Sequence, residues 1–169
     1  MFKNILSMTD FSEDADYAVS TAIQLAKSFG AKLTILHIIH DESQLPFYLS
    51  SIQYEELNKA IIVEIERKFR EYQEKMADLK NIQYVTKIRR GSSYAQGIIE
   101  MEEGDYDLVV IGSHGQSALK KFFYGSTSEK IIRRSPISVL VTKMVQRWEY
   151  SSNFPLIFLG QRKVNSQQQ

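Results

Sequence analysis

The sequence contains no cysteine, which excludes disulfide bridges and thiolate metal sites and is typical of a reducing compartment. It also lacks long hydrophobic runs, because no apolar stretch approaches the roughly 18 residues that a membrane-spanning helix needs. Neither sign of charge is in excess: 21 Lys and Arg face 20 Asp and Glu, which leaves a formal net charge of +1. No global field therefore attracts nucleic acid or an anionic membrane.

The first sixteen residues hold a few apolar side chains and then several acids, and no secretory signal peptide fits them. We therefore expect a soluble, cytoplasmic protein. A length of 169 residues is typical of one domain. The segment 144–169 differs from the rest, since it holds the only Trp, an apolar patch at 154–159 and a Gln-rich end. We expect a domain at 1–143 and a partly disordered C-terminal extension at 144–169.

Short apolar runs alternate with helical patterns along residues 1–143. We expect strands at 2–8, 32–39, 84–89, 108–111 and 138–142. Helical spacing indicates helices at about 13–29, 53–79, 94–103 and 128–134, the second being one long helix without caps that lies across a sheet. In the helix at 94–103, Ala95, Ile98 and Ile99 are expected to face inward. The alternation predicts an α/β sandwich with a mostly parallel sheet.

The most informative stretch is DLVVIGSHGQSALKKFFYGSTS, residues 107–128. After its apolar run come three glycines: Gly112, Gly115 and Gly125. Ser126 and Glu129 stand in capping-box spacing, so Ser126 is expected to be the N-cap of the next helix. A strand, a glycine-bearing loop and a helix N-terminus suit phosphate, because backbone N–H groups and the helix dipole point at the same place. Neither a Walker loop nor G-x-G-x-x-G occurs, so phosphate would be held by another loop design.

The expected sheet brings separate segments together. In parallel sheets, ligands bind outside the carboxyl ends of strands, where the strand order reverses. That rule places Thr9-Asp10, Ile38-Ile39 and residues 112–126 on one edge. An ionised Asp10 accepts hydrogen bonds from sugar hydroxyls, but it suits the N-cap of the first helix equally well, and the sequence leaves both roles open.

Other constellations are less informative. His37 and His40 are three apart on a strand, so they point to opposite faces and cannot share a metal ion; His37 is expected to be a core or edge histidine. His114 is the one histidine near the expected phosphate site, with a solvent-facing turn role as the alternative. Lys120 or Lys121 could reach phosphate. No Ser-His-Asp order or carboxylate pair indicates a hydrolase, so no catalytic residue and no protein-held metal ion is predicted.

These residues resemble the universal stress protein family. The spacing Gly112-x2-Gly115-x9-Gly125-Ser126 is similar to the glycine pattern of its ATP-binding members, and DLVVIGSHG, SEKIIRRSPISVLVTK and Thr9-Asp10-Phe11-Ser12 also fit. The resemblance extends over residues 1–143. It implies a Rossmann-like α/β sandwich with a five-stranded sheet and ATP at the carboxyl edge, commonly in a dimer.

Position by position, the resemblance also implies contacts. Thr9 and Asp10 would approach adenine and ribose, and Ile38 would contact the base. Ile111 and Gly112 would border the nucleoside. The phosphates, usually with a divalent ion such as Mg²⁺, would meet Gly115, Gly125, Ser126 and Thr127. Two residues depart from the family pattern: Met8 replaces a small residue or Pro, and Thr127 replaces Val.

The sequence thus predicts an ATP-binding stress-response regulator in which nucleotide occupancy alters dimer or partner contacts, with slow hydrolysis left open. Two alternatives remain: a nucleotide-independent dimeric interaction module of the same fold, and a binder of AMP or a cyclic nucleotide in the same pocket. The homodimer is expected to form through the edge strand 138–142, reinforced by residues 154–159. No nucleic-acid or membrane partner is expected, since a basic stripe with stacking aromatics is lacking, and any protein partner is unknown.

Overall fold

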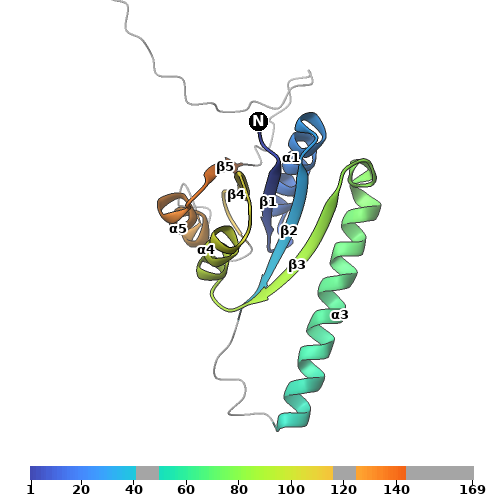
Figure 1. The fold of residues 1–169 in the computed structure, drawn as a ribbon. Coiled ribbons are helices and arrows are strands. Elements are labelled where there is room, and N and C mark those ends of the chain that lie inside the picture. Colours follow the sequence, from blue (N-terminus) through green and yellow to red (C-terminus); the bar gives the residue numbers. More distant parts are fainter. Residues whose placement is uncertain (41–49, 116–124, 144–169) are drawn as a thin grey trace, which may run out of the picture.

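A parallel sheet with the strand order β3-β2-β1-β4-β5 organises the fold (Figure 1). The computed structural model describes residues 1–40, 50–115 and 125–143. The strands are β1 (Asn4–Thr9), β2 (Lys32–Ile39), β3 (Tyr84–Arg90), β4 (Leu108–Gly112) and β5 (Ser138–Thr142). The helices are α1 (Glu13–Phe29), α3 (Ser51–Lys75), α4 (Ser93–Glu103) and α5 (Ser126–Arg134), with the 3₁₀ helix η1 (Ala77–Asn81) after α3.

The strand order reverses beside β1. This strand pairs in parallel with β2 on one side and with β4 on the other, and every strand pairing in the described part of the chain is parallel. The predicted α/β fold with a five-stranded, mostly parallel sheet is therefore confirmed. The carboxyl ends of β1 and β4 separate at this reversal, and parallel sheets bind ligands at such a point.

Two hydrophobic cores cover the two faces of the sheet. Alternate residues of β1 serve different cores, because successive strand side chains point to opposite faces. Ile5 packs with α1 and the C-terminal half of α3, whereas Leu6 packs with α4 and α5. The N-terminal half of α3 extends beyond the sheet (Figure 1), and Ile52 there is 70% exposed. In the described ranges, no helix combines the length and apolarity that crossing a membrane requires.

Helix α1 begins and ends at strong local signals. Ser12 is its N-cap and accepts a hydrogen bond from the backbone N–H of Ala15, and three acids load the first turn: Glu13, Asp14 and Asp16. Gly30 ends the helix in the left-handed conformation, with φ 64°, as the Phe29-Gly30 pair predicts. The alternative that Asp10 caps this helix is wrong, because Ser12 occupies that position.

Helix α3 differs from its prediction at both ends. It is capped rather than uncapped: Ser50 accepts from the backbone N–H of Gln53, whose side chain accepts from the backbone N–H of Ser50. It also ends at Lys75, where the predicted helix continued to residue 79, and the chain tightens into η1.

One smaller prediction was wrong and another holds in part. Gly125, and not Ser126, is the N-cap of α5, with no side-chain cap bond. In α4, Ile98 packs against the core as expected but is only half-buried, like Ala95 and Ile99, whereas the buried residues are Gly97, Glu100 and Met101.

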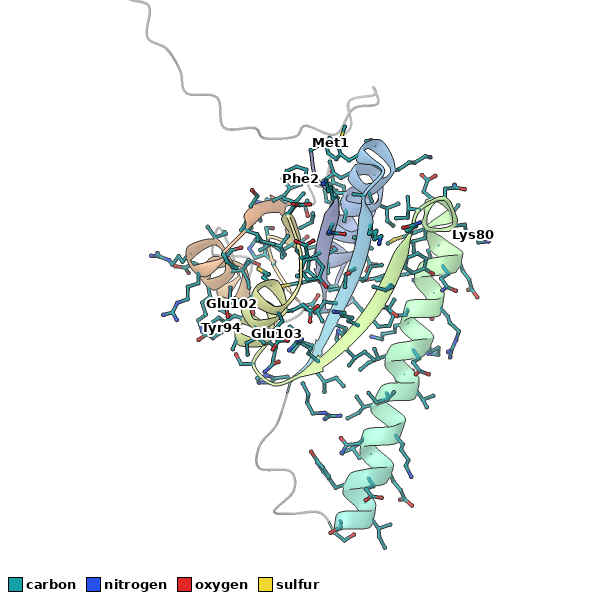
Figure 2. The ribbon with its side chains drawn as sticks, in the orientation of Figure 1. Met1, Phe2, Lys80, Tyr94, Glu102 and Glu103 are labelled. Atoms are coloured by element: carbon teal, nitrogen blue, oxygen red, sulfur yellow. The ribbon has the colours of Figure 1, made fainter. Side chains whose placement is uncertain are left out.

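Glu100 is a buried carboxylate that joins three elements. Its side chain is 1% exposed, while Glu102 and Glu103 on the same helix lie at the surface (Figure 2). Lys87 Nζ and the Tyr106 hydroxyl each donate to Oε1 at 2.6 Å, and Arg89 Nε donates to Oε2 at 2.6 Å. These bonds fasten α4 to β3 and to the turn before β4.

Candidate functional site

A cavity of about 370 Å³ opens at the carboxyl ends of β1, β2 and β4, where the strand order reverses. Its volume lies in the usual range of small-molecule sites, about 300–1,000 Å³. All nine residues that the sequence singles out line it: Thr9, Asp10, Ile38, Ile111, Gly112, Gly115, Gly125, Ser126 and Thr127. The wall also contains Met8, Ala15, Leu36, Ser93, His114, Ser128 and Ile131.

The cavity wall combines two kinds of surface. Its aliphatic residues belong to the core between the sheet and helices α4 and α5: Met8, Leu36, Ile38, Ile111 and Ile131. Its polar residues come from the turn after β1, from the segment after β4 and from the first turn of α5. Such a wall suits a ligand with one flat apolar part and one strongly polar part.

The turn after β1 holds Asp10 at the cavity. Asp10 Oδ1 accepts a hydrogen bond of 3.0 Å from the backbone N–H of Ser12, a local turn that aspartate commonly forms. The Thr9 hydroxyl is engaged with the Tyr72 hydroxyl of α3, at 2.7 Å between the oxygens. Although residue 9 lines the cavity, this hydroxyl is therefore occupied by a partner from α3.

His37 supports the same turn from β2. Its Nδ1 lies 2.9 Å from the Thr9 carbonyl oxygen, which can only accept, so Nδ1 carries a proton and donates. Burial lowers the pKa of His37 below 6.5, against the opposing effect of this hydrogen bond. The ring packs on Phe11 at 4.7 Å between centroids. The predicted role of a core or edge histidine is confirmed.

Two of the three glycines on the cavity wall lie where a side chain would collide with the protein. A Cβ at position 112 would lie 2.9 Å from the backbone carbonyl atoms of Asp14, so only glycine lets β4 pass the start of α1. A Cβ at position 115 would lie 2.5 Å from Asp10 Oδ2. The structure thus places Asp10 and Gly115, which are 105 positions apart in the sequence, side by side on the cavity wall.

Asp14 is a site-forming residue that sequence reasoning missed. Its Oδ2 accepts hydrogen bonds from the Ser113 hydroxyl at 3.0 Å and from the backbone N–H of His114 at 3.1 Å. The Ser113 oxygen also lies 2.9 Å from His114 Nδ1. Asp14 therefore ties the first turn of α1 to the loop after β4. In the sequence it is one acid among several at a helix start, and no local signal indicates a partner 99 residues away.

The first turn of α5 closes the polar side of the cavity. Residues Ser126, Thr127 and Ser128 all line it, and the first backbone N–H groups of an α-helix have no intrahelical acceptors. Ser128 donates its hydroxyl to the Gly112 carbonyl oxygen at 2.8 Å, which fastens α5 to the end of β4. The Ser126 side chain is exposed. This turn is electrostatically suited to an anion.

The site has no protein-built metal centre in the part of the chain that the structure describes, because no three acidic or histidine side chains gather there. The predicted phosphate contacts of Lys120 or Lys121 lie outside the described residues.

Comparisons with known proteins agree on one family. The model of the universal stress protein family matches residues 1–143. A Staphylococcus saprophyticus protein named for this family is 32% identical over 145 residues, which cover 84% of each chain. The solved structure of hypothetical protein MJ0577 has a TM-score of 0.72 and 26% identity, covering 87% of this chain and 99% of that one. A universal stress protein solved in complex with cAMP has a TM-score of 0.56 and 23% identity, covering 84% and 97%.

Proposed function

The chain belongs to the universal stress protein family, and we propose that it is a regulatory member that binds ATP, with Mg²⁺, in the cavity at the carboxyl edge of its sheet. One observation carries the proposal. A single cavity combines an aliphatic surface, the carboxylate of Asp10 and the N-terminal turn of α5. A base requires an apolar surface, a sugar requires a hydrogen-bond acceptor, and a phosphate chain requires backbone donors such as those of a helix N-terminus.

Each part of the nucleotide has a chemically suitable partner. The base would pack on Ile38 and Ile111, since flat aromatic rings bind well in aliphatic clefts. Asp10 would accept hydrogen bonds from the ribose hydroxyls, because an ionised carboxylate has only acceptors. The phosphates would bind the backbone of residues Gly115 and 125–127, where donors and the helix dipole favour negative charge. When bound, Mg²⁺ would neutralise part of the phosphate charge.

We propose binding with at most slow turnover. A hydrolase needs a base that can hold the attacking water, and His114 is the one imidazole on the cavity wall. Its ring nitrogen Nδ1 lies against Ser113, and both residues are tied to Asp14. These bonds fix Ser113 and His114 directly after β4, and a fixed backbone is the property that a phosphate-binding segment needs.

Titration of the purified protein with ATP and Mg²⁺ tests the proposal. We expect saturable binding with Kd below about 1 mM, measured by calorimetry. AMP and cAMP serve as competitors, because the neighbour in complex with cAMP raises the alternative of a different nucleotide in the same pocket. If AMP or cAMP bound more tightly than ATP, that nucleotide and not ATP would be the preferred ligand. Absence of any binding at millimolar nucleotide would favour the nucleotide-independent interaction module.

We further propose that the chain forms a homodimer whose contacts change when nucleotide binds. The cytoplasmic location remains a prediction. Strand β5 forms one edge of the sheet, and Val139, Leu140 and Val141 on it are only half-buried. Unpaired apolar edges favour association. We expect a dimer at about 10–100 µM, the range in which weak interfaces assemble, and a mass or shape change on adding ATP, both measured by light scattering. A monomer under all these conditions would contradict this part.

The extension at 144–169 lies outside the described residues, so the reinforcement of the dimer by residues 154–159 and the domain division at residue 143 remain predictions. A chain truncated after Lys143 is expected to dimerise more weakly than the full chain. Equal dissociation constants would show that the extension does not contribute.

A further inference from the structure

A directed chain of hydrogen bonds runs behind the cavity, from the turn after β1 through α3 to α1. The backbone N–H of Phe11 donates to the Thr9 hydroxyl oxygen at 2.9 Å. That oxygen lies 2.7 Å from the Tyr72 hydroxyl, which donates to Asp16 Oδ1 at 2.6 Å. Because Tyr72 has one proton and gives it to Asp16, it accepts the proton of Thr9. All four groups are thereby satisfied in one direction.

Tyr72 is well suited to hold this chain in place. The residue is 3% exposed and belongs to the core beneath α1 and α3. Burial, together with the bond to Asp16, raises the pKa of Tyr72, so its hydroxyl stays protonated over the neutral range and remains a donor. The ring of Phe11 packs on Tyr72 and Phe69, with centroids 5.5 Å and 5.4 Å apart. The turn is thus held by a buried bond and by ring packing.

The turn that Tyr72 supports has an unfavourable backbone. Phe11 has φ 61°, the left-handed region that residues other than glycine avoid. Such a conformation persists only where the surroundings impose it. Besides the ring packing and the bond from His37, the hydrogen bond from the Phe11 N–H to Thr9 restrains this conformation, and Tyr72 orients the oxygen that accepts it. Weakening this restraint lets the turn relax toward an ordinary conformation.

Asp10 lies between the two restrained residues. Its Oδ1 accepts from the Ser12 N–H, and its Oδ2 faces the position of Gly115 across the cavity wall. Tyr72 does not line the cavity, whereas Asp10 does. A change in the Thr9–Phe11 backbone therefore moves the carboxylate that faces the ligand, although Tyr72 itself touches no ligand.

We propose that Tyr72 is a positioning residue for the sugar of the bound nucleotide: through Thr9 and the left-handed Phe11 it sets the carboxylate of Asp10, and so determines the preference for ribose over deoxyribose. This inference rests on the proposed function, since it concerns the ligand of the same cavity. It assigns a role in ligand selection to a helix on the opposite face of the sheet from α4 and α5.

Comparing ATP with 2′-deoxy-ATP tests the inference. Tyr72→Phe removes one oxygen and keeps the ring. We expect the wild-type protein to prefer ATP about 10-fold, as suits a hydrogen bond from one sugar hydroxyl to a carboxylate. In the variant, ATP affinity should fall about 10-fold while 2′-deoxy-ATP affinity changes less than about two-fold. Calorimetry measures all four dissociation constants, and circular dichroism checks the fold.

Tyr106→Phe is the matched control, because Tyr106 also donates a partly buried hydroxyl to a carboxylate, but that carboxylate belongs to Glu100 of α4 and not to the hydrogen-bond chain behind Asp10. It should keep the ribose preference. If Tyr72→Phe does not fold, Asp16→Ala serves instead. It removes the acceptor at the end of the hydrogen-bond chain and should also lower the preference for ATP over 2′-deoxy-ATP.

The possible results separate the two proposals. A Tyr72→Phe protein with an unchanged ratio, or with both nucleotides weakened equally, would overturn the positioning role and leave ATP binding intact. The same holds for a wild-type protein that binds both nucleotides equally. A wild-type protein that binds neither would overturn both proposals.

Discussion

A Gly115→Ala protein is expected to bind ATP about 100-fold more weakly than the wild-type protein, or by roughly 2.7 kcal/mol, with little change in its free energy of unfolding. The new Cβ would lie 2.5 Å from Asp10 Oδ2, a distance that non-bonded atoms do not adopt. Asp10 is short and bonded to the Ser12 N–H, so it can yield only by leaving its turn. The variant therefore loses the sugar acceptor and the close approach of backbone to phosphate together. Calorimetric titration and urea denaturation measure the two effects.

Gly125→Ala is the matched comparison. Position 125 has φ −70°, which alanine adopts freely, and among the described residues a Cβ there would meet no atom nearer than 3.5 Å. This variant leaves Asp10 in place, so any loss of affinity should come from weaker phosphate contacts alone. The preference for ribose should therefore persist. Gly115→Ala should instead lose that preference. Equal behaviour of the two variants, or full ATP binding by Gly115→Ala, would refute the predicted contact between Asp10 and the ligand.

The largest effect on stability is expected at Glu100. Glu100→Ala should lower the free energy of unfolding by about 3–5 kcal/mol, because it removes a buried carboxylate that accepts three hydrogen bonds, and bonds to a charged group contribute about 1.5–3 kcal/mol each. The carboxylate is 1% exposed, and it receives hydrogen bonds from Lys87, Arg89 and Tyr106. Glu103 is the control, since it pairs with the same Arg89 but is 62% exposed. Glu103→Ala should cost less than about 1 kcal/mol in the same urea denaturation.

The same network predicts a pH dependence. Burial alone would raise the pKa of Glu100, but the hydrogen bonds from Lys87, Tyr106 and Arg89 outweigh it and lower that pKa below 4.5. A carboxyl group with a lowered folded-state pKa stabilises the fold above its unfolded value, and this contribution is lost as the pH falls through the folded value. Wild-type stability should therefore decline below about pH 4.5.

The Glu100→Gln protein should show a shallower decline over the same pH range, because glutamine does not titrate. Part of the decline should remain, since hydrogen bonds from the backbone N–H groups of Lys3 and Asn4 also lower the pKa of Asp107. Urea denaturation at several pH values measures both curves. Parallel curves for the two proteins would exclude Glu100 as a source of the acid sensitivity.

The sequence by itself determined the fold class and which strand ends meet at one edge of the sheet. Residues 32–39 and 108–111 were identifiable as strands because they are apolar on both faces, as a covered parallel sheet requires, and both lie within the observed sheet. The order of strands and helices brings the ends of β1, β2 and β4 to one edge. Local composition and connectivity are sufficient for this because crossovers between parallel strands have a fixed hand.

Only the tertiary structure decided which side chains meet. Capping-box spacing favoured Ser126 as the N-cap, because Gly125 and Ser128 do not form that pattern, yet the backbone is already helical at Ser126, which makes Gly125 the N-cap. The inward face of α4 was predicted from its aliphatic residues, but its rotation buries Glu100, whose three donors come from β3 and from the turn before β4. Periodicity reports hydrophobicity and cannot report a paired buried charge.

The same limit applies to the bonds that shape the site. Asp14 reaches Ser113 across 99 residues and Tyr72 reaches Thr9 across 63. Hydrogen bonds act over about 3 Å in space, so their partners depend on how α1 and α3 pack against the sheet. A sequence shows which groups can donate and accept, and packing then decides which of them are close enough to do so.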